Sequence, residues 1–283
     1  MITMAVLTVR EAARRRLLWL LIGLTIGSVA LTGWGVERLA TLAREGGSDE
    51  LAIRIGVSQV LILVAFMFSF VVAMTAAFLA APAIAGDLES GVALAMLARP
   101  IRRADLVVGR WLGLSIILAG YAAASGLLEI WVVAVLTGHS PPYPLVAVGF
   151  LAGQGMIILT LALLLGTRLP SVGAGAVCVV LFGLAWMAGV LAGIARIFDV
   201  EVLAVVARAT RWLLPTDGLW RGVVFGLEPP LVIAGAGRAI GPIAEANPFY
   251  ASAPPPLEFV AFSIAWVVLV LGLAVWSLNR REL

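Results

Sequence analysis

Six long apolar runs dominate this sequence and constrain its fold more than any other feature. Each has about twenty residues or more, which lets a helix cross a hydrocarbon core of roughly 30 Å at 1.5 Å per residue. Of the 283 residues, 62% are hydrophobic and only 12% are charged, whereas a soluble protein must cover its core with polar residues. The sequence therefore predicts an all-α polytopic membrane protein with one transmembrane domain. The predicted spans are residues 17–36, 55–85, 106–137, 145–166, 172–194 and 259–278.

The segments outside these runs predict the remaining parts of the fold. Residues 1–16 combine four arginines with apolar residues, so we expect an interfacial helix ahead of the first span. Residues 37–54 should be a polar loop. The second and third spans exceed one bilayer thickness, and their excess length should protrude, tilt or bend.

Residues 196–256 form one long outer excursion between the fifth and sixth spans, richer in charge and proline than its flanks. We expect a helix near residues 200–214 that lies at the membrane interface. Trp212 and Trp220 are its expected aromatic anchors at headgroup level. Asp217 and Arg221 should be the solvated groups beside them.

Residues 86–105 interrupt the apolar runs with three acids and three arginines around a short apolar core. The spacing predicts a helix over about 91–98, with Ser90 capping its start and Pro100 forcing its end. A short surface helix held between two spans is suited to docking by another protein. The other interpretation is that this loop rests on anionic lipid.

The arginines predict the orientation of the chain. With six spans, both termini share one side with residues 86–105 and with Arg168. That side holds eleven of the nineteen arginines against five acids, and the positive-inside rule makes it cytoplasmic. We therefore expect a multi-pass protein of the cytoplasmic membrane with both termini in the cytoplasm.

The composition argues against chemistry carried by this chain. All nineteen basic residues are arginine, so a Walker-A loop, which needs lysine, is excluded. His139 is the single histidine and Cys178 the single cysteine, which leaves no histidine-rich metal site and no intrachain disulfide. We expect no catalytic residues, no metal, no cofactor in this chain and no nucleic-acid partner.

Glu129 is the one ionisable residue well inside a predicted span. It lies about nineteen residues, roughly 28 Å, beyond Arg110, which places it near the outer headgroups. One interpretation is a carboxylate that extends to the interface. The other is a polar contact at the outer mouth of a substrate path.

Three short runs resemble a known family. Gly86-Asp-Leu-Glu-Ser-Gly91, then Leu97-Ala-Arg-Pro100, then Gly109-Arg-Trp-Leu-Gly113 resemble the first cytoplasmic loop of type-2 ATP-binding-cassette (ABC) permeases. The opening residues 8–16 are similar to the branch that contains copper-enzyme maturation and gliding-motility permeases. Two departures are Val92, where threonine is usual, and Arg110, where lysine is usual.

The resemblance implies a function and a set of partners. In that family this loop is a coupling helix that docks into a separate ATPase subunit, so ATP and Mg would bind in that partner, and a second permease copy, identical or paralogous, would complete a dimer within membrane lipid. The outer excursion would act as a lid, with Glu129, Trp212, Trp220 and Arg221 at the outer mouth. The coupling positions implied are Asp87, Glu89, Gly91, Met96, Arg99 and Pro100.

Three functions remain open from the sequence. The first is the permease subunit of an ATP-driven ABC exporter. The second is an integral-membrane enzyme of lipid or quinone metabolism, which the scarcity of His, Asp and Ser clusters disfavours. The third is a membrane scaffold or sensor that recruits an ATPase without transporting.

Overall fold

The computed structural model describes residues 2–13, 16–91, 102–230, 232–233 and 246–281, and these residues fold into helices without any strand. Six of the helices are long and apolar enough to cross a membrane, which confirms the predicted fold class. Three shorter helices accompany them in the part of the chain that the structure describes. The six long helices are α2 (Arg16–Glu45), α3 (Glu50–Glu89), α5 (Arg103–Thr137), α6 (Pro144–Gly166), α7 (Ser171–Phe198) and α12 (Leu257–Asn279). The shorter helices are α1 (Ile2–Ala13), α8 (Glu201–Leu213) and α9 (Thr216–Leu227).

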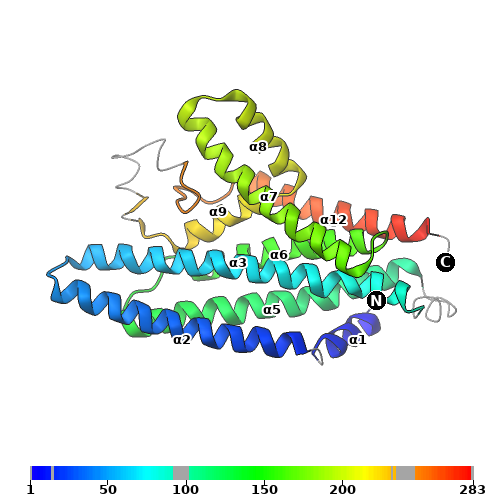
Figure 1. Ribbon diagram of the computed structural model, residues 1–283, viewed down its shortest axis with the longest axis horizontal. Helices are drawn as coiled ribbons and strands as arrows, with labels where there is room; N and C mark the ends of the chain where they lie inside the picture. The colour runs from blue at the N-terminus through cyan, green and yellow to red at the C-terminus, as the bar shows by residue number, and fades with distance from the viewer. Residues whose placement is uncertain (1, 14–15, 92–101, 231, 234–245, 282–283) are drawn as a thin grey trace.

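The bundle has two ends. At one end lie α1, the last turn of α3, the start of α5 and the α6–α7 connection, and we call it the proximal end. The last turn of α12 is also at this end (Figure 1). The opposite end, where α2 turns into α3, is the distal end. The α7–α8 pair and α9 stand on one side of the bundle.

Helix α2 is longer than expected from hydropathy. The first span was predicted to end at residue 36, but the helix continues to Glu45 and turns at Gly47, whose φ is +76°. The physical reason is a second small core at the distal end. Its buried residues are Val36, Ala40, Ile53, Val57, Leu61 and Val133. The charged residues of 37–45 therefore lie on the exposed side of a packed helix and do not form a loop.

Helix α6 occupies the middle of the bundle and contacts α3, α5, α7, α9 and α12. It has nearly no polar face, and glycine permits its closest approach to α3 and α5. A Cβ at Gly155 would lie 2.6 Å from Val72 Cγ1 and 2.8 Å from Leu118 Cδ2. A side chain there would have to displace Val72 and Leu118, so glycine keeps the close packing of these helices.

The outer excursion differs from the expected surface lid. Helix α9 packs mainly against α6. The two helices can approach closely because residue 226 is glycine, and a Cβ at Gly226 would lie 2.7 Å from the backbone nitrogen of Ala147. Gln154 of α6 fixes its start, donating from Nε2 to the Thr216 carbonyl at 2.9 Å while its Oε1 accepts from Ser69 Oγ at 2.8 Å. The excursion thus inserts one helix among the distal halves of the spans.

This insertion overturns two expected positions. Trp220, expected at headgroup level, is 1% exposed, and its indole Nε1 donates to the Pro248 carbonyl at 2.7 Å. Asp217, expected in solvent, is buried and pairs with Arg211 at 2.9 Å. Trp212 on α8 is exposed, and its ring lies edge-on to Phe262 with centroids 4.4 Å apart.

Candidate functional site

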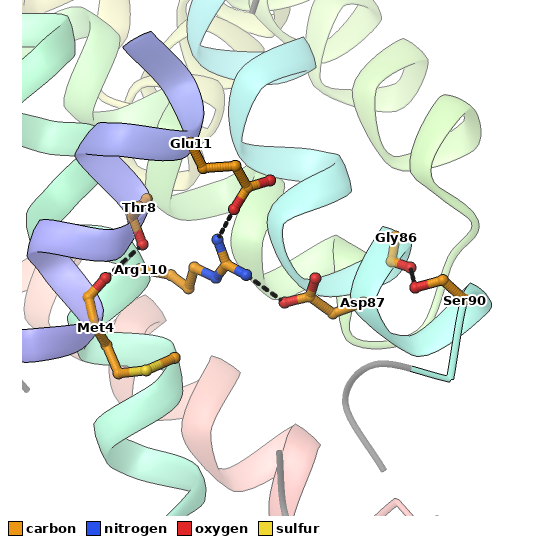
Figure 2. Close-up of polar contacts among 7 residues, drawn as sticks. All are labelled: Met4, Thr8, Glu11, Gly86, Asp87, Ser90 and Arg110. Carbon is orange, nitrogen blue, oxygen red and sulfur yellow. Dashed lines mark hydrogen bonds and ion pairs between the residues drawn. The ribbon is translucent and has the colours of Figure 1, made fainter. Parts of the chain in front are cut away.

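Helix α1 lies against α5 at the proximal end, and a glycine makes the close approach possible. A Cβ at Gly113 would lie 2.7 Å from both the Ala5 carbonyl oxygen and Thr8 Cβ. The Thr8 hydroxyl donates to the Met4 carbonyl at 2.8 Å (Figure 2), so this polar side chain is satisfied inside its own helix. The predicted interfacial helix is therefore docked on a membrane span.

An ionic node of three residues joins three helices next to this contact. Arg110 of α5 donates from Nη1 to Glu11 Oε2 of α1 at 2.6 Å and from Nη2 to Asp87 Oδ2 of α3 at 2.7 Å (Figure 2). The exposed fractions of the side chains are 6% for Arg110, 16% for Asp87 and 47% for Glu11. Charge-assisted bonds from a buried guanidinium are strong, and only a fork of donors can hold two carboxylates in this way.

Glu89 makes a second link between helices. Its Oε1 accepts the backbone N–H of Ser171 at 2.8 Å, and its Oε2 accepts the Ser171 hydroxyl at 3.1 Å. Ser171 is the first residue of α7, so the carboxylate satisfies an otherwise unpaired N–H and faces the positive end of the helix dipole. The last turn of α3 is thereby attached to α7.

Arginines hold the C-terminal ends of two other helices at the proximal end. Arg103, the first residue of α5, donates from Nη1 to the carbonyls of Leu278 and Arg281 at 2.6 and 2.9 Å. Arg168 donates from Nε to Ser277 Oγ at 2.9 Å, and Arg281 donates from Nη1 to the Thr167 carbonyl at 2.6 Å. Cations at helix C-termini satisfy the last carbonyls and oppose the negative end of the dipole.

The structure places only part of the predicted coupling set. Met96, Arg99 and Pro100 lie outside the described residues, as does nearly all of the predicted helix over 91–98. Asp87 and Glu89 belong to the last turn of α3 and were wrongly assigned to a loop before a new helix.

Ser90 follows the last residue of α3, and its hydroxyl donates to the Gly86 carbonyl at 2.7 Å (Figure 2). The helix that it was predicted to cap lies outside the described residues. Gly91 then has φ of +72°, a conformation that glycine adopts without strain.

The four outer-mouth candidates do not form one cluster. Glu129 of α5 is buried and accepts a hydrogen bond from Ser28 Oγ of α2 at 2.7 Å, so it does not extend to the interface. It lines a small cavity together with Val223 and Leu227 of α9. Trp220 is in the core and Trp212 is on the outside of α8. Arg221 is half-buried on α9.

Sequence reasoning missed one buried carboxyl group. Glu228 follows α9, is 1% exposed, and accepts the backbone N–H of Ala251 on Oε2 at 3.1 Å. Its Oε1 is buried without a hydrogen-bond partner among the described residues. Burial raises the pKa of this carboxyl to about 7, partly opposed by the bond from Ala251. The only sequence signal was its place before two prolines.

The described residues contain no group of His, Cys, Asp or Glu side chains that could hold a metal. The polar groups described above at the proximal end connect helices to one another. Their arrangement suits the transmission of movement between helices.

Comparison with known proteins agrees with this geometry. None of the curated proteins matches the chain in sequence. The model of the ABC-2 family transporter proteins matches residues 3–283, nearly the whole chain. The protein is therefore a member of the ABC-2 transporter family, a multi-pass membrane permease component of an ABC transporter.

Proposed function

We propose that this chain is the permease subunit of an ATP-driven exporter and that a separate ATPase subunit moves it through residues 86–105. The observation that supports this most strongly is the ionic node of Arg110, Glu11 and Asp87, which joins α1, α3 and α5 in the turns flanking that segment. A displacement of the segment reaches three helices at once. Separating a buried, hydrogen-bonded ion pair is costly, so the three helices move together.

The lengths of α3 and α5 support a lever action. With 40 and 35 residues, they extend about 60 and 52 Å at 1.5 Å per residue, well beyond one hydrocarbon core. Each is continuous from residues 86–105, which we call the docking segment, to the distal end. Movement at one end therefore appears at the other as a rigid tilt.

Two further contacts distribute this movement. The bond from Ser171 to Glu89 connects α3 with α7, and Arg103 connects α5 with the end of α12. Four of the six spanning helices thus have a direct polar link to the residues that flank the docking segment. Helix α6 follows through packing, because it lies in the middle of the bundle.

The orientation and the partners complete the proposal. The excess of arginine at the proximal end supports a cytoplasmic position for that end by the positive-inside rule, and the cytoplasm is where ATP is present. ATP and Mg then bind wholly in the ATPase, and a second permease copy, identical or paralogous, provides the other half of the transport path. Scaffolding without transport is the competing function.

A pull-down tests the docking. The tagged chain is purified from native membranes, and co-purifying ATPase is identified by mass spectrometry and quantified against the permease. We expect Arg99→Glu to reduce the bound ATPase at least about tenfold, since charge reversal in an interface adds repulsion. The matched control is Arg38→Glu, at an exposed position on α2 toward the distal end, and it should leave binding unchanged.

Two outcomes contradict the proposal. In a chain whose buried Cys178 is replaced by alanine, a cysteine at position 99 should resist an impermeant maleimide in intact cells, and one at position 49 should react. The reverse pattern refutes the orientation. If the purified complex hydrolyses ATP in vesicles but moves no compound across them, the scaffold interpretation replaces transport.

A further inference from the structure

A lateral groove of about 480 Å³ opens on the side of the bundle, between α6 and α12. Trp111 of α5 and Leu219 of α9 contribute to its wall. The exposed Ile264 lies along its edge, so the groove communicates with the lipid that surrounds the spanning helices. It is distinct from the ionic node and from the docking segment.

Two glycines leave the floor of this groove empty. A Cβ at Gly149 would have no atom within 4 Å, and one at Gly153 would meet only Leu219 Cδ1 at 3.6 Å. Gly155 on the same helix is different, because Val72 and Leu118 already fill the space beside it. The glycines that face the core serve helix packing, whereas Gly149 and Gly153 keep a space open.

The groove offers hydrocarbon contacts and no polar ones. Trp111 Nε1 donates to Thr160 Oγ1 at 2.9 Å, and the Ser263 hydroxyl donates to the Phe259 carbonyl at 2.9 Å. Both polar side chains in its wall are therefore satisfied within the protein. A polar ligand would lose its hydrogen bonds to water there without replacement, whereas an alkyl chain would not.

The position of the groove defines which part of the membrane faces it. Along α6 it extends from Val146, close to the distal start of the helix, to Ile157. The rise along the helix from residue 146 to residue 157 is about 16 Å at 1.5 Å per residue. This is roughly half of a hydrocarbon core of about 30 Å. The groove therefore has about the length of one acyl chain in the distal leaflet.

We propose that this groove is a binding site for one acyl chain of a bilayer phospholipid in the distal leaflet. Lipid tails are as apolar as leucine, so no hydrophobic force favours the groove over the bilayer. The favourable contribution is the contact of one chain with four helices on several sides. The proposal goes beyond the coupling function, and it does not depend on which end of the bundle is cytoplasmic.

Photocrosslinking in nanodiscs tests the site. The full chain is reconstituted with phosphatidylcholine that carries a diazirine in one acyl chain, irradiated, and digested, and adducts are mapped by mass spectrometry. We expect adducts concentrated on residues 146–157 and 260–267. Gly149→Leu should lower the yield at these residues roughly fivefold, because its side chain takes the space and the contacts of the lipid chain.

A matched variant separates groove filling from general effects. Gly272 of α12 is exposed, and a Cβ there would also have no atom within 4 Å, but it lies outside the groove. Gly272→Leu should leave adducts at 146–157 unchanged. Thermal unfolding should be alike in both variants, since a Cβ at either position would have no atom within 4 Å.

Three results would overturn the acyl-chain site. Adducts spread evenly over every lipid-facing helix would indicate surrounding lipid without a site. Unchanged adducts in Gly149→Leu would show that the groove is not what the chain occupies. Crosslinks from these residues to a second copy of the chain, without lipid adducts, would assign the groove to a protein interface. None of these results bears on ATPase binding, so failure here leaves the coupling proposal standing.

Discussion

Replacing Arg110 with methionine removes the charge of the ionic node and keeps most of the side-chain length. Breaking a buried pair by removing one partner costs about 3–5 kcal/mol, because the other charge stays buried. Here Asp87 is 16% exposed and Glu11 is 47% exposed, so solvent screens the pair with Glu11 much more. We therefore expect a loss near the lower limit, about 3 kcal/mol, that comes mainly from Asp87.

The chain contains a matched control for this perturbation. Arg54 and Glu50 form a pair with 3.6 Å between Nε and Oε1, and their side chains are 52% and 55% exposed. Exposed pairs at this helical spacing contribute about 0.3–0.5 kcal/mol. Arg54→Met should therefore have an effect several times smaller than Arg110→Met in the same equilibrium unfolding titration in detergent micelles.

A double-mutant cycle assigns the effect to the node. Asp87→Asn alone should also destabilise the protein, whereas Asp87→Asn in the Arg110→Met background should cost little, since the two residues act as one unit. Arg110→Lys should be intermediate, because an ammonium group does not present the fork that reaches both carboxylates.

Amide hydrogen exchange shows which helices are destabilised by the loss of the Arg110 side chain. In Arg110→Met the amides of α1 should exchange faster, because α1 loses its ionic link to α3 and α5, while those of the α6 core should stay protected. Equal effects of the Arg110 and Arg54 variants, or unchanged exchange in α1, would refute the argument that the node holds these helices together.

Three further perturbations test other contacts. Gly113→Ala should free α1 from α5, because the new methyl group would lie 2.7 Å from Thr8 Cβ; faster proteolysis of α1 is the measurement, and unchanged proteolysis refutes it. Glu89→Ala should destabilise the start of α7 by about 1 kcal/mol, seen as faster exchange of its first amides, whereas Glu89→Gln should retain part of the effect. Glu228 has a pKa raised from 4.5 to about 7, so the folded state binds the proton more tightly than the unfolded state and stability should fall by up to about 3 kcal/mol as pH rises from 4.5 through 7. The variant Glu228→Gln should lack this fall in a pH series of melting temperatures, and an identical fall in the variant would exclude Glu228 as its source.

The spanning helices were predictable because their signal is local. An apolar run of twenty or more residues has few alternatives to a helix once it is in lipid, since every backbone group must be paired internally. The predicted span at 55–85 became α3 from Glu50 to Glu89, and the span at 145–166 became α6 from Pro144 to Gly166. Hydropathy ended the first span too early, because Val36 and Ala40 remain buried by contacts that no local pattern reveals.

Side-chain partners were not predictable, because they depend on residues distant in sequence. Asp87 and Glu89 suggested a docking surface, but in the folded chain Arg110 pairs with Asp87 and Ser171 binds Glu89. Their charges were visible in the sequence, and their partners were not.

The sequence by itself determined that this chain is a membrane protein with six apolar spans and with no lysine for a Walker-A loop, because length, hydropathy and lysine content are properties of the chain before it folds. Tertiary structure decided where its polar and aromatic groups lie. Trp220 has the character of an interfacial residue, yet the glycines of α9 let that helix approach α6 so closely that the indole ring enters the core. Close approach between helices is a property of pairs of surfaces, and only the folded chain brings those surfaces together.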